Sequence, residues 1–235
     1  MTQAEEKHMK ILIFNGSPKR EKSDTMHLTR AFVDGMNEHE KNEVNTVTVA
    51  DKHIEFCTGC FTCKKNSGTC IHDDDMAVLL EEILASDLLI FSFPLYCYGM
   101  PAKLKALIDR TLPLSSMAMQ KVDGRYEHPA QRDYSHLKYL MICGCGFPNS
   151  ENNFEAMKLQ FGLMFPHSST MITVSEAPMF NVPEADSVTK PFLRLVKEAG
   201  KEYAENGCIS GETLEKLSEP MIPHEAYADI VNYGI

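Results

Sequence analysis

Near the start of the chain, Lys10-Ile-Leu-Ile-Phe-Asn15-Gly16-Ser17-Pro18 is an apolar run that stops abruptly at a turn. A short apolar run bounded by glycine and proline is typical of a buried strand. Helical spacing follows over residues 25–38, with Thr25 at the expected cap and an apolar face made by Leu28, Ala31, Phe32, Gly35 and Met36. We therefore predict that the chain begins with one strand–helix unit.

The same pattern recurs four more times along the chain. Apolar runs predict strands over residues 44–50, 88–93, 137–143 and 169–175. Helices are expected over residues 76–84, which the acidic residues 73–75 precede, over residues 104–112 and 154–164, and in a last segment whose first turn contains Pro191. Since parallel neighbours need crossover helices, this order predicts an α/β fold with a doubly wound, five-stranded parallel sheet covered on both faces.

Two segments fall outside this alternation. Residues 114–136 are polar and aromatic, and we expect an irregular excursion there. After about residue 205 we expect an appendage with a short helix, which Ser210 caps and Pro220 ends, followed by an irregular terminus. The predicted organisation is one sheet domain over residues 9–205 with a C-terminal helical extension over residues 206–235.

The composition limits the classes of partner. The 235 residues are 43% hydrophobic and 24% charged, which is ordinary for a globular chain with a core. The net charge of −10 repels phosphate backbones and anionic lipid, so we expect neither nucleic acid nor a membrane as a partner. No apolar run is long enough for a membrane span, and the polar start MTQAEEKHMK is unlike a secretory signal. We expect a cytoplasmic protein.

The loop after the first strand has the groups that a phosphate needs. Residues 16–25 place a glycine, cations and the hydroxyls of Ser17, Ser23 and Thr25 between a strand and a helix N-terminus. The loop lacks both the Walker pattern and Gly-x-Gly-x-x-Gly, so a monophosphate fits it better than a nucleoside triphosphate or a dinucleotide. The alternative is a solvated turn whose hydroxyls cap the helix, with Lys19 and Arg20 as surface charges.

The topology points to two further loops. Ligands of doubly wound sheets bind beyond the carboxyl ends of the strands, where the strand order reverses. After the third strand, Tyr96 and Tyr98 offer rings and hydroxyls, and Gly99 lets backbone approach a ligand. After the fourth strand, Gly144 and Gly146 leave room for a ring edge. Ordinary packing of the two tyrosines beneath a loop is the alternative.

Three segments together carry a family resemblance: residues 16–25, residues 94–110, which begin Pro-Leu-Tyr-Cys-Tyr-Gly, and Cys145-Gly-Phe-Pro-Asn149. Over most of residues 9–205 the chain resembles the NADPH-dependent FMN reductase family of flavodoxin-like proteins. The resemblance implies the strand order 2-1-3-4-5 and a bound FMN. It implies that the phosphate contacts Ser17, Lys19, Ser23, Asp24 and Thr25, and that the ring lies between Pro94, Leu95, Tyr96, Cys97, Tyr98 and Gly99 on one margin and Cys143, Gly144, Cys145, Gly146 and Phe147 on the other.

Four cysteines crowd into the loop after the second strand. Cys57, Cys60, Cys63 and Cys70 have the spacing C-x2-C-x2-C-x6-C, in which close thiolates can wrap one inorganic core. The long last spacer and Ile71 in place of proline depart from the ferredoxin pattern, and a zinc site usually separates its cysteine pairs more widely. The motif resembles that of iron–sulfur flavoproteins, a branch of the same superfamily, which implies a [4Fe–4S] cluster. The alternative is a reduced, redox-sensitive thiol loop.

The function expected from this resemblance is an FMN-dependent NAD(P)H oxidoreductase. Reducing equivalents would pass from NAD(P)H through FMN to a quinone-, flavin- or nitro-type acceptor, with no catalytic side chain required because the cofactor carries the reaction. The alternatives are an iron–sulfur flavoprotein that carries electrons between redox protein partners, and an inactive flavin or thiol sensor. We expect a homodimer or tetramer, because FMN in this family lies near a subunit boundary.

Overall fold

The structure of the protein, a computed structural model, describes residues 8–166 and 168–234. Five strands form one parallel sheet in the order β2-β1-β3-β6-β7. They are β1 (Lys10–Asn15), β2 (Glu43–Thr48), β3 (Leu88–Pro94), β6 (Lys138–Gly144) and β7 (Ser169–Val174). Within this sheet the order is 2-1-3-4-5, so the predicted doubly wound, flavodoxin-like topology is confirmed.

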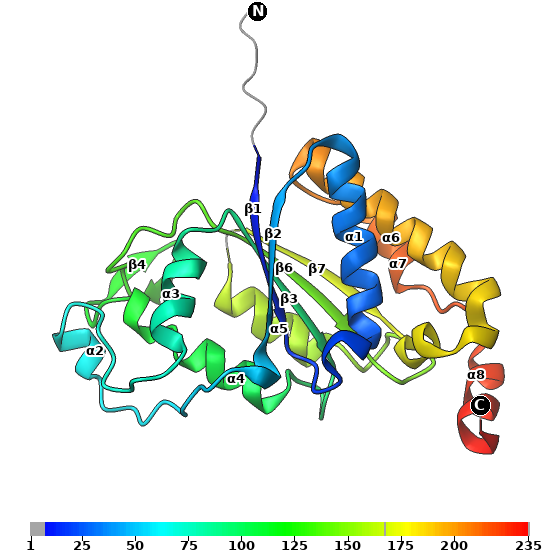
Figure 1. Ribbon diagram of the computed structural model, residues 1–235, viewed down its shortest axis with the longest axis horizontal. Helices are drawn as coiled ribbons and strands as arrows, with labels where there is room; N and C mark the ends of the chain where they lie inside the picture. The colour runs from blue at the N-terminus through cyan, green and yellow to red at the C-terminus, as the bar shows by residue number, and fades with distance from the viewer. Residues whose placement is uncertain (1–7, 167, 235) are drawn as a thin grey trace, which may run out of the picture.

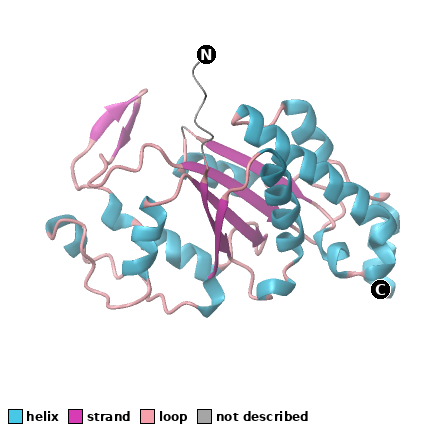
Figure 2. Ribbon diagram, turned by 45° about the horizontal axis from the view of Figure 1, so that its top comes forward, coloured by secondary structure: helices cyan, strands magenta, loops and turns pink. Residues whose placement is uncertain are grey.

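Helices cover both faces of the sheet (Figure 1). One face carries α1 (Asp24–His39) and α6 (Asp186–Asn206), which pack against each other. The other face carries α3 (Met76–Leu84), α4 (Ala102–Asp109) and α5 (Glu155–Met164). Figure 2 shows the sheet between these two layers. None of the helices within residues 8–166 and 168–234 has the length and apolar character that a membrane span requires.

The alternation of side chains along β1 produces the two layers. Leu12 and Phe14 belong to the core beneath α3, α4 and α5, whereas Ile11 and Ile13 belong to the core beneath α1 and α6. Successive side chains of a strand point to opposite faces, so a strand covered on both faces is apolar at every position. The unbroken apolar run of β1 therefore reflects its interior place in the sheet, between β2 and β3.

Two predicted helix starts were wrong. Helix α6 begins at Asp186, so Pro191 lies inside the helix and not in its first turn. Residues 186–190 are mostly polar and show no apolar periodicity, and proline is favoured in the first turn of a helix. For these two reasons the helix start predicted from the sequence was five residues too late. Helix α1 begins at Asp24 with Ser23 as its N-cap residue, so Thr25 is not the cap.

The two irregular segments have more regular structure than expected. Residues 114–136 contain an antiparallel hairpin of β4 (Gln120–Val122) and β5 (Arg125–Glu127), whose three-residue strands are too short to show alternation.

The predicted cap at Ser210 is confirmed, because its hydroxyl accepts a hydrogen bond from the Thr213 N–H at the start of α7 (Gly211–Ser218). The terminus is not irregular, because α8 (His224–Tyr233) follows Pro223. The sequence did not predict this helix, because Pro220 and Pro223 lie just before it.

Short helical turns complete the fold. The cysteine-rich loop contains α2 (Thr62–Lys65). Short 3-10 helices occur at Arg20–Lys22, Val49–Asp51, Leu112–Leu114, Ala177–Asn181 and Pro183–Ala185. Ile209 and Leu217 of the C-terminal extension are buried in the same core as α1 and α6, so the extension packs directly on the sheet domain.

Helices α1 and α6 meet backbone to backbone. A Cβ added at Gly35 would lie 1.9 Å from the Lys197 carbonyl oxygen, far inside van der Waals contact. We therefore expect Gly35→Ala to lower the unfolding free energy by about 1–3 kcal/mol, as overpacking does, although alanine is the better helix former. Gly211→Ala is the matched control, because nothing lies within 4 Å of its added Cβ. Equal unfolding free energies for the two variants in urea would contradict this contact.

Candidate functional site

Asn15 organises the loop that follows β1. Its side chain is fully buried; Oδ1 accepts from the Ser17 N–H at 3.1 Å and Nδ2 donates to the Arg20 carbonyl at 3.0 Å. Gly16 is tightly packed beside it, because a Cβ there would lie 2.7 Å from Leu104 Cδ2 and 3.1 Å from Phe93 Cβ. Asn15 was not among the residues predicted from the sequence, although a polar residue that ends an apolar strand just before a glycine turn was a usable signal.

The three predicted hydroxyls lie together at the start of α1. Ser17, Ser23 and Thr25 are each 1% exposed, and the Ser23 and Thr25 hydroxyls are 2.9 Å apart. Behind them, Ser92 on β3 donates to Thr25 Oγ1 at 3.1 Å, and the Thr29 and Ser92 hydroxyls are 2.8 Å apart. Because Thr25 accepts from Ser92, its own hydrogen remains available to Ser23 or to a ligand. Ser92 and Thr29 are supporting residues that the sequence reasoning missed.

The two cations of the loop have different places. Lys19 Nζ lies 2.9 Å from Asp24 Oδ2 at the start of α1, and the Asn181 amide donates to the other oxygen of Asp24. Arg20 instead pairs with Asp51 at 2.6 Å on the exposed surface. A phosphate bound at this helix end would therefore lie beside the Asp24 carboxylate, and Lys19 is the cation placed to compensate both negative groups.

The loop after β3 is a tight two-residue turn. The N–H of Tyr96 donates to the Gly99 carbonyl at 3.0 Å and the reverse bond is also 3.0 Å. Cys97 and Tyr98, between them, both have positive φ, at 49° and 61°. Such turns ordinarily use glycine or asparagine, and strained backbone of this kind clusters at binding sites. Leu95 joins this loop to the next one, because its N–H donates to the Gly144 carbonyl at 2.7 Å.

The loop after β6 lies close to α1 and to the end of β7. A Cβ at Gly144 would lie 2.7 Å from Ala177 Cβ and 3.0 Å from Thr25 Cγ2, so only glycine fits there. Burial raises the pKa of the Cys145 thiol to about 11, which leaves it neutral at physiological pH. Phe147 is 46% exposed, and its ring lies nearly parallel to that of Tyr98, with centroids 6.4 Å apart.

These loops enclose a cavity of about 220 Å³ at the carboxyl ends of the strands. Its lining residues are Ser17, Lys19, Asp24, Thr25, Pro94, Leu95, Tyr96, Gly144, Cys145, Gly146, Ala177 and Pro178. All but Ala177 and Pro178, which follow β7, were named from the sequence. Two of the other predicted residues are buried: Ser23 lies beside Thr25, and Cys143 is in the core. The remaining four, Cys97, Tyr98, Gly99 and Phe147, lie outside the cavity lining.

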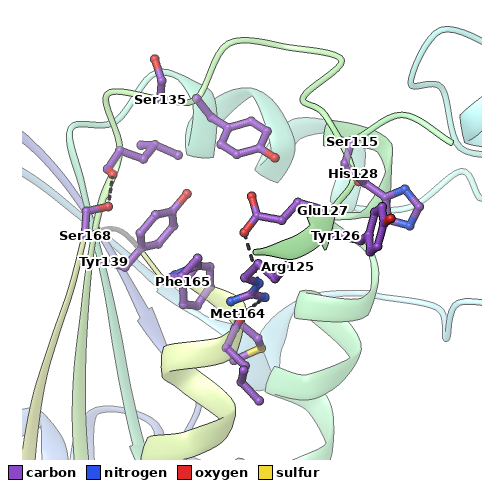
Figure 3. Close-up of a pocket in the computed structure, with 14 residues that line it drawn as sticks. Ser115, Arg125, Tyr126, Glu127, His128, Ser135, Tyr139, Met164, Phe165 and Ser168 are labelled. Carbon is purple, nitrogen blue, oxygen red and sulfur yellow. Dashed lines mark hydrogen bonds and ion pairs between the residues drawn. The ribbon is translucent and has the colours of Figure 1, made fainter. Parts of the chain in front are cut away.

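A larger hollow of about 580 Å³ lies beneath the β4–β5 hairpin (Figure 3). It is at the amino ends of β6 and β7, where Tyr139 stacks on Phe165 with ring centroids 4.1 Å apart. Its charged groups Arg125 and Glu127 pair with each other at 3.3 Å. Its described lining residues include neither a glycine nor the first turn of a helix, so the smaller cavity, which has both, is the better candidate for a phosphate-bearing ligand.

The structure places the four loop cysteines at different depths. Cys63 is buried, Cys70 is half-buried, and Cys57 and Cys60 are exposed; all are free thiols. Burial raises the pKa of the Cys63 thiol; Lys64 opposes this shift, whereas the negative charges of the other three cysteines add to it.

A cluster fits the donor groups around this loop. No three histidine, cysteine or acidic side chains within the described ranges gather around a single metal ion. An iron–sulfur core is wider than one ion and takes its ligands farther apart. Two buried nitrogen atoms have no hydrogen-bond partner among the described residues: His72 Nε2, two residues beyond Cys70 in the sequence, and Nε of Arg110, whose Nη2 lies 3.5 Å from Cys70 Sγ. Sulfur acceptors at this place would satisfy them, so the residues present fit a [4Fe–4S] group.

Comparison with known proteins gives the family. A family model described as flavodoxin-like fold matches residues 9–190. The chain belongs to this family of flavodoxin-like proteins, and the predicted resemblance to it is confirmed.

Among its relatives, an iron–sulfur flavoprotein from Methanocaldococcus jannaschii is 36% identical over 106 residues, which are 45% of this chain and 53% of the relative. An FMN-dependent NADH:quinone oxidoreductase from Trichormus variabilis is 29% identical over 128 residues, 49% of this chain and 60% of the relative. The chain therefore spans about half the length of the curated relatives it matches. A solved NAD(P)H:quinone oxidoreductase from Methanothermobacter marburgensis shares the fold, with a TM-score of 0.60 and 18% identity over 83% of this chain and 97% of that chain.

Proposed function

We propose that this protein is an FMN-dependent oxidoreductase that passes reducing equivalents from NAD(P)H to a quinone-, flavin- or nitro-type acceptor. The observation that carries the proposal is the cavity at the carboxyl ends of the strands, where buried hydroxyls and a helix N-terminus meet two glycine-containing loops. The names of two kinds of relative, iron–sulfur flavoproteins and FMN-dependent quinone oxidoreductases, agree with it.

The phosphate end of FMN would bind to the loop after β1. Ser17 and Thr25 supply hydroxyl donors, and the first N–H groups of α1 supply partial positive charge. Lys19 supplies a full positive charge from the cavity wall. When bound, FMN supplies the hydride chemistry, accepting reducing equivalents from NAD(P)H and delivering them to a second substrate.

The ring end would lie between the other two loops. The turn at Tyr96–Gly99 forms one margin, and Gly144, Cys145 and Gly146 form the other. Tyr96 and Tyr98 are 46% and 54% exposed, so their rings remain available to stack against a flat substrate. We assign no acid–base side chain, because the neutral Cys145 thiol and the tyrosines bind and orient without transferring a proton.

Steady-state turnover tests this proposal. The protein loaded with FMN is expected to oxidise NADH or NADPH in proportion to an added quinone, and the protein stripped of FMN is expected to be inactive until FMN is restored. Turnover independent of FMN, or no turnover with quinone, nitroaromatic and free flavin acceptors, would overturn the proposal.

A second candidate function is electron carriage by an iron–sulfur flavoprotein. The observation that favours it is the four-cysteine loop together with two buried nitrogen atoms, His72 Nε2 and Arg110 Nε, which have no hydrogen-bond partner in the described part of the chain. Iron and acid-labile sulfide in protein purified without air, together with negligible NAD(P)H oxidation, support this candidate. Rapid NAD(P)H oxidation supports the enzyme, and protein without bound flavin contradicts both.

We propose a homodimer or tetramer as the assembly. Large apolar side chains are exposed on the cysteine loop and the 114–136 excursion, among them Phe56, Ile71, Met119 and Tyr126. We expect light scattering at micromolar concentration to give at least twice the chain mass of 26.5 kDa. A monomer that still binds FMN tightly would contradict this assembly.

We also propose a cytoplasmic location. It suits the eight free thiols, which persist in a reducing compartment.

A further inference from the structure

Arg110, just after α4, forms a buried ion pair with Asp74 across from it. The guanidinium reaches both carboxylate oxygens, with Nη1 at 2.6 Å from Oδ2 and Nη2 at 3.0 Å from Oδ1. The two side chains are 2% and 0% exposed. A two-point contact of this kind fixes orientation as well as distance, and removing one partner leaves an uncompensated buried charge.

The pair holds both ends of the cysteine loop. At the front end, Arg110 Nη1 donates to the Glu55 carbonyl at 2.8 Å, and the Glu55 N–H donates to Asp74 at 2.8 Å. At the back end, Asp74 accepts from the Met76 N–H at 3.1 Å, at the start of α3. All four clustered cysteines lie between Glu55 and Asp74, so this pair joins the two ends of the segment that contains them, beside the hydrogen bonds between His53 and Asp75.

Arg110 also contacts one of the cysteines directly. Its Nη2 lies 3.5 Å from Cys70 Sγ, within hydrogen-bond distance for sulfur. Its Nε is buried and has no partner in the described part of the chain. The guanidinium thus donates toward the sulfur on one side while the Asp74 carboxylate and the Glu55 carbonyl hold it in place on the other.

We propose that Arg110 is a positioning residue for an iron–sulfur centre on the cysteine loop, holding Cys70 in place and donating an N–H to its sulfur. The inference rests on the proposed ligation by Cys57, Cys60, Cys63 and Cys70. Hydrogen bonds to cluster sulfurs stabilise the more negative, reduced state, so this donor raises the reduction potential of the centre. Arg110 therefore sets both the retention of the cluster and the ease with which it is reduced.

The test compares two neutralised ion pairs. Arg110→Gln/Asp74→Asn removes both buried charges together and so avoids leaving one of them unpaired. The matched control is Arg132→Gln/Glu81→Gln, which removes an exposed two-point ion pair between Arg132 and Glu81 of α3. The N–O distances in this pair are 2.5 and 2.8 Å. Iron per chain, FMN per chain and the midpoint potential of the cluster are measured on full-length protein purified without air.

We expect the Arg110/Asp74 variant to hold at least fivefold less iron than the wild type, with normal FMN, and the remaining clusters to have a more negative midpoint potential. The control should match the wild type in all three measurements. Iron content and potential equal to those of the wild type would overturn the proposal. If the double variant does not fold, Arg110→Lys keeps the charge but loses the two-point contact, and the same shift in potential is expected of it, with Arg132→Lys as its control.

Failure of the proposed cluster gives a different pattern. Wild-type protein without iron after anaerobic, iron-replete production overturns the cluster and the cluster role of Arg110 together. Hydrogen exchange in residues 56–73 then tests the loop closure separately, with exchange at least tenfold faster expected in the Arg110/Asp74 variant and no change in the control. Unchanged exchange would overturn the closure as well.

Discussion

Replacing both phosphate-loop hydroxyls, in the double variant Ser17→Ala/Thr25→Ala, is expected to weaken FMN binding roughly ten- to a thousandfold. Both side chains are buried and line the cavity at the start of α1. The two removed donors together cost about 1.4–4 kcal/mol, because their acceptor is one buried charged group and the two losses act on the same phosphate. The dissociation constant is measured by the change in flavin fluorescence.

Two controls separate phosphate binding from general damage. Thr46→Ala/Ser187→Ala removes two exposed hydroxyls away from the cavity and is expected to leave FMN affinity unchanged. Riboflavin, which lacks the phosphate, should bind the Ser17/Thr25 variant and the wild type about equally. An FMN affinity that does not change in the Ser17/Thr25 variant would remove the phosphate from this loop.

Serine in place of any one loop cysteine is expected to remove most of the iron. Cys57, Cys60, Cys63 and Cys70 would ligate one cluster, so losing one ligand destabilises the whole group. FMN, bound by other loops, should remain. Iron and FMN per chain are measured on protein purified without air, and Cys208→Ser, at an exposed cysteine beyond α6, is the matched control.

The thiol alternative predicts a different result. A loop of reduced cysteines contains no stoichiometric iron even when the protein is made under iron- and sulfide-replete anaerobic conditions, and its free-thiol count includes all four residues. That result would exclude the cluster and leave the FMN proposal standing.

The sheet order was predictable because each strand carries its own signal. Buried parallel strands are apolar at every position, as Leu88–Pro94 shows, and the intervening apolar periodicity marks the crossover helices. The α6 start and the α8 helix were not predictable, since Pro191 looks locally like a start and Pro220 like a stop. Only the completed fold places Pro191 within a helix and a further helix after Pro223.

The loops that form the site could be predicted from the sequence, but the side-chain contacts within it could not. Residues such as Thr25 and Tyr96 were found because they follow the strands whose carboxyl ends meet. Ser92 was missed because its partner Thr25 lies 67 residues away in the sequence. Cys143 and Cys145 resemble each other in the motif, yet β6 continues to Gly144, so Cys143 remains in the core and only Cys145 lines the cavity.

The most direct test of the central claim is the visible spectrum of protein purified without air, recorded before and after mixing with NADH or NADPH. The proposal predicts the two absorption bands of bound oxidised flavin, with a broad iron–sulfur shoulder if the cysteine loop is loaded, and rapid bleaching of the flavin bands by the nicotinamide. A spectrum without flavin bands after reconstitution with FMN, or flavin bands that neither NADH nor NADPH bleaches, would contradict it.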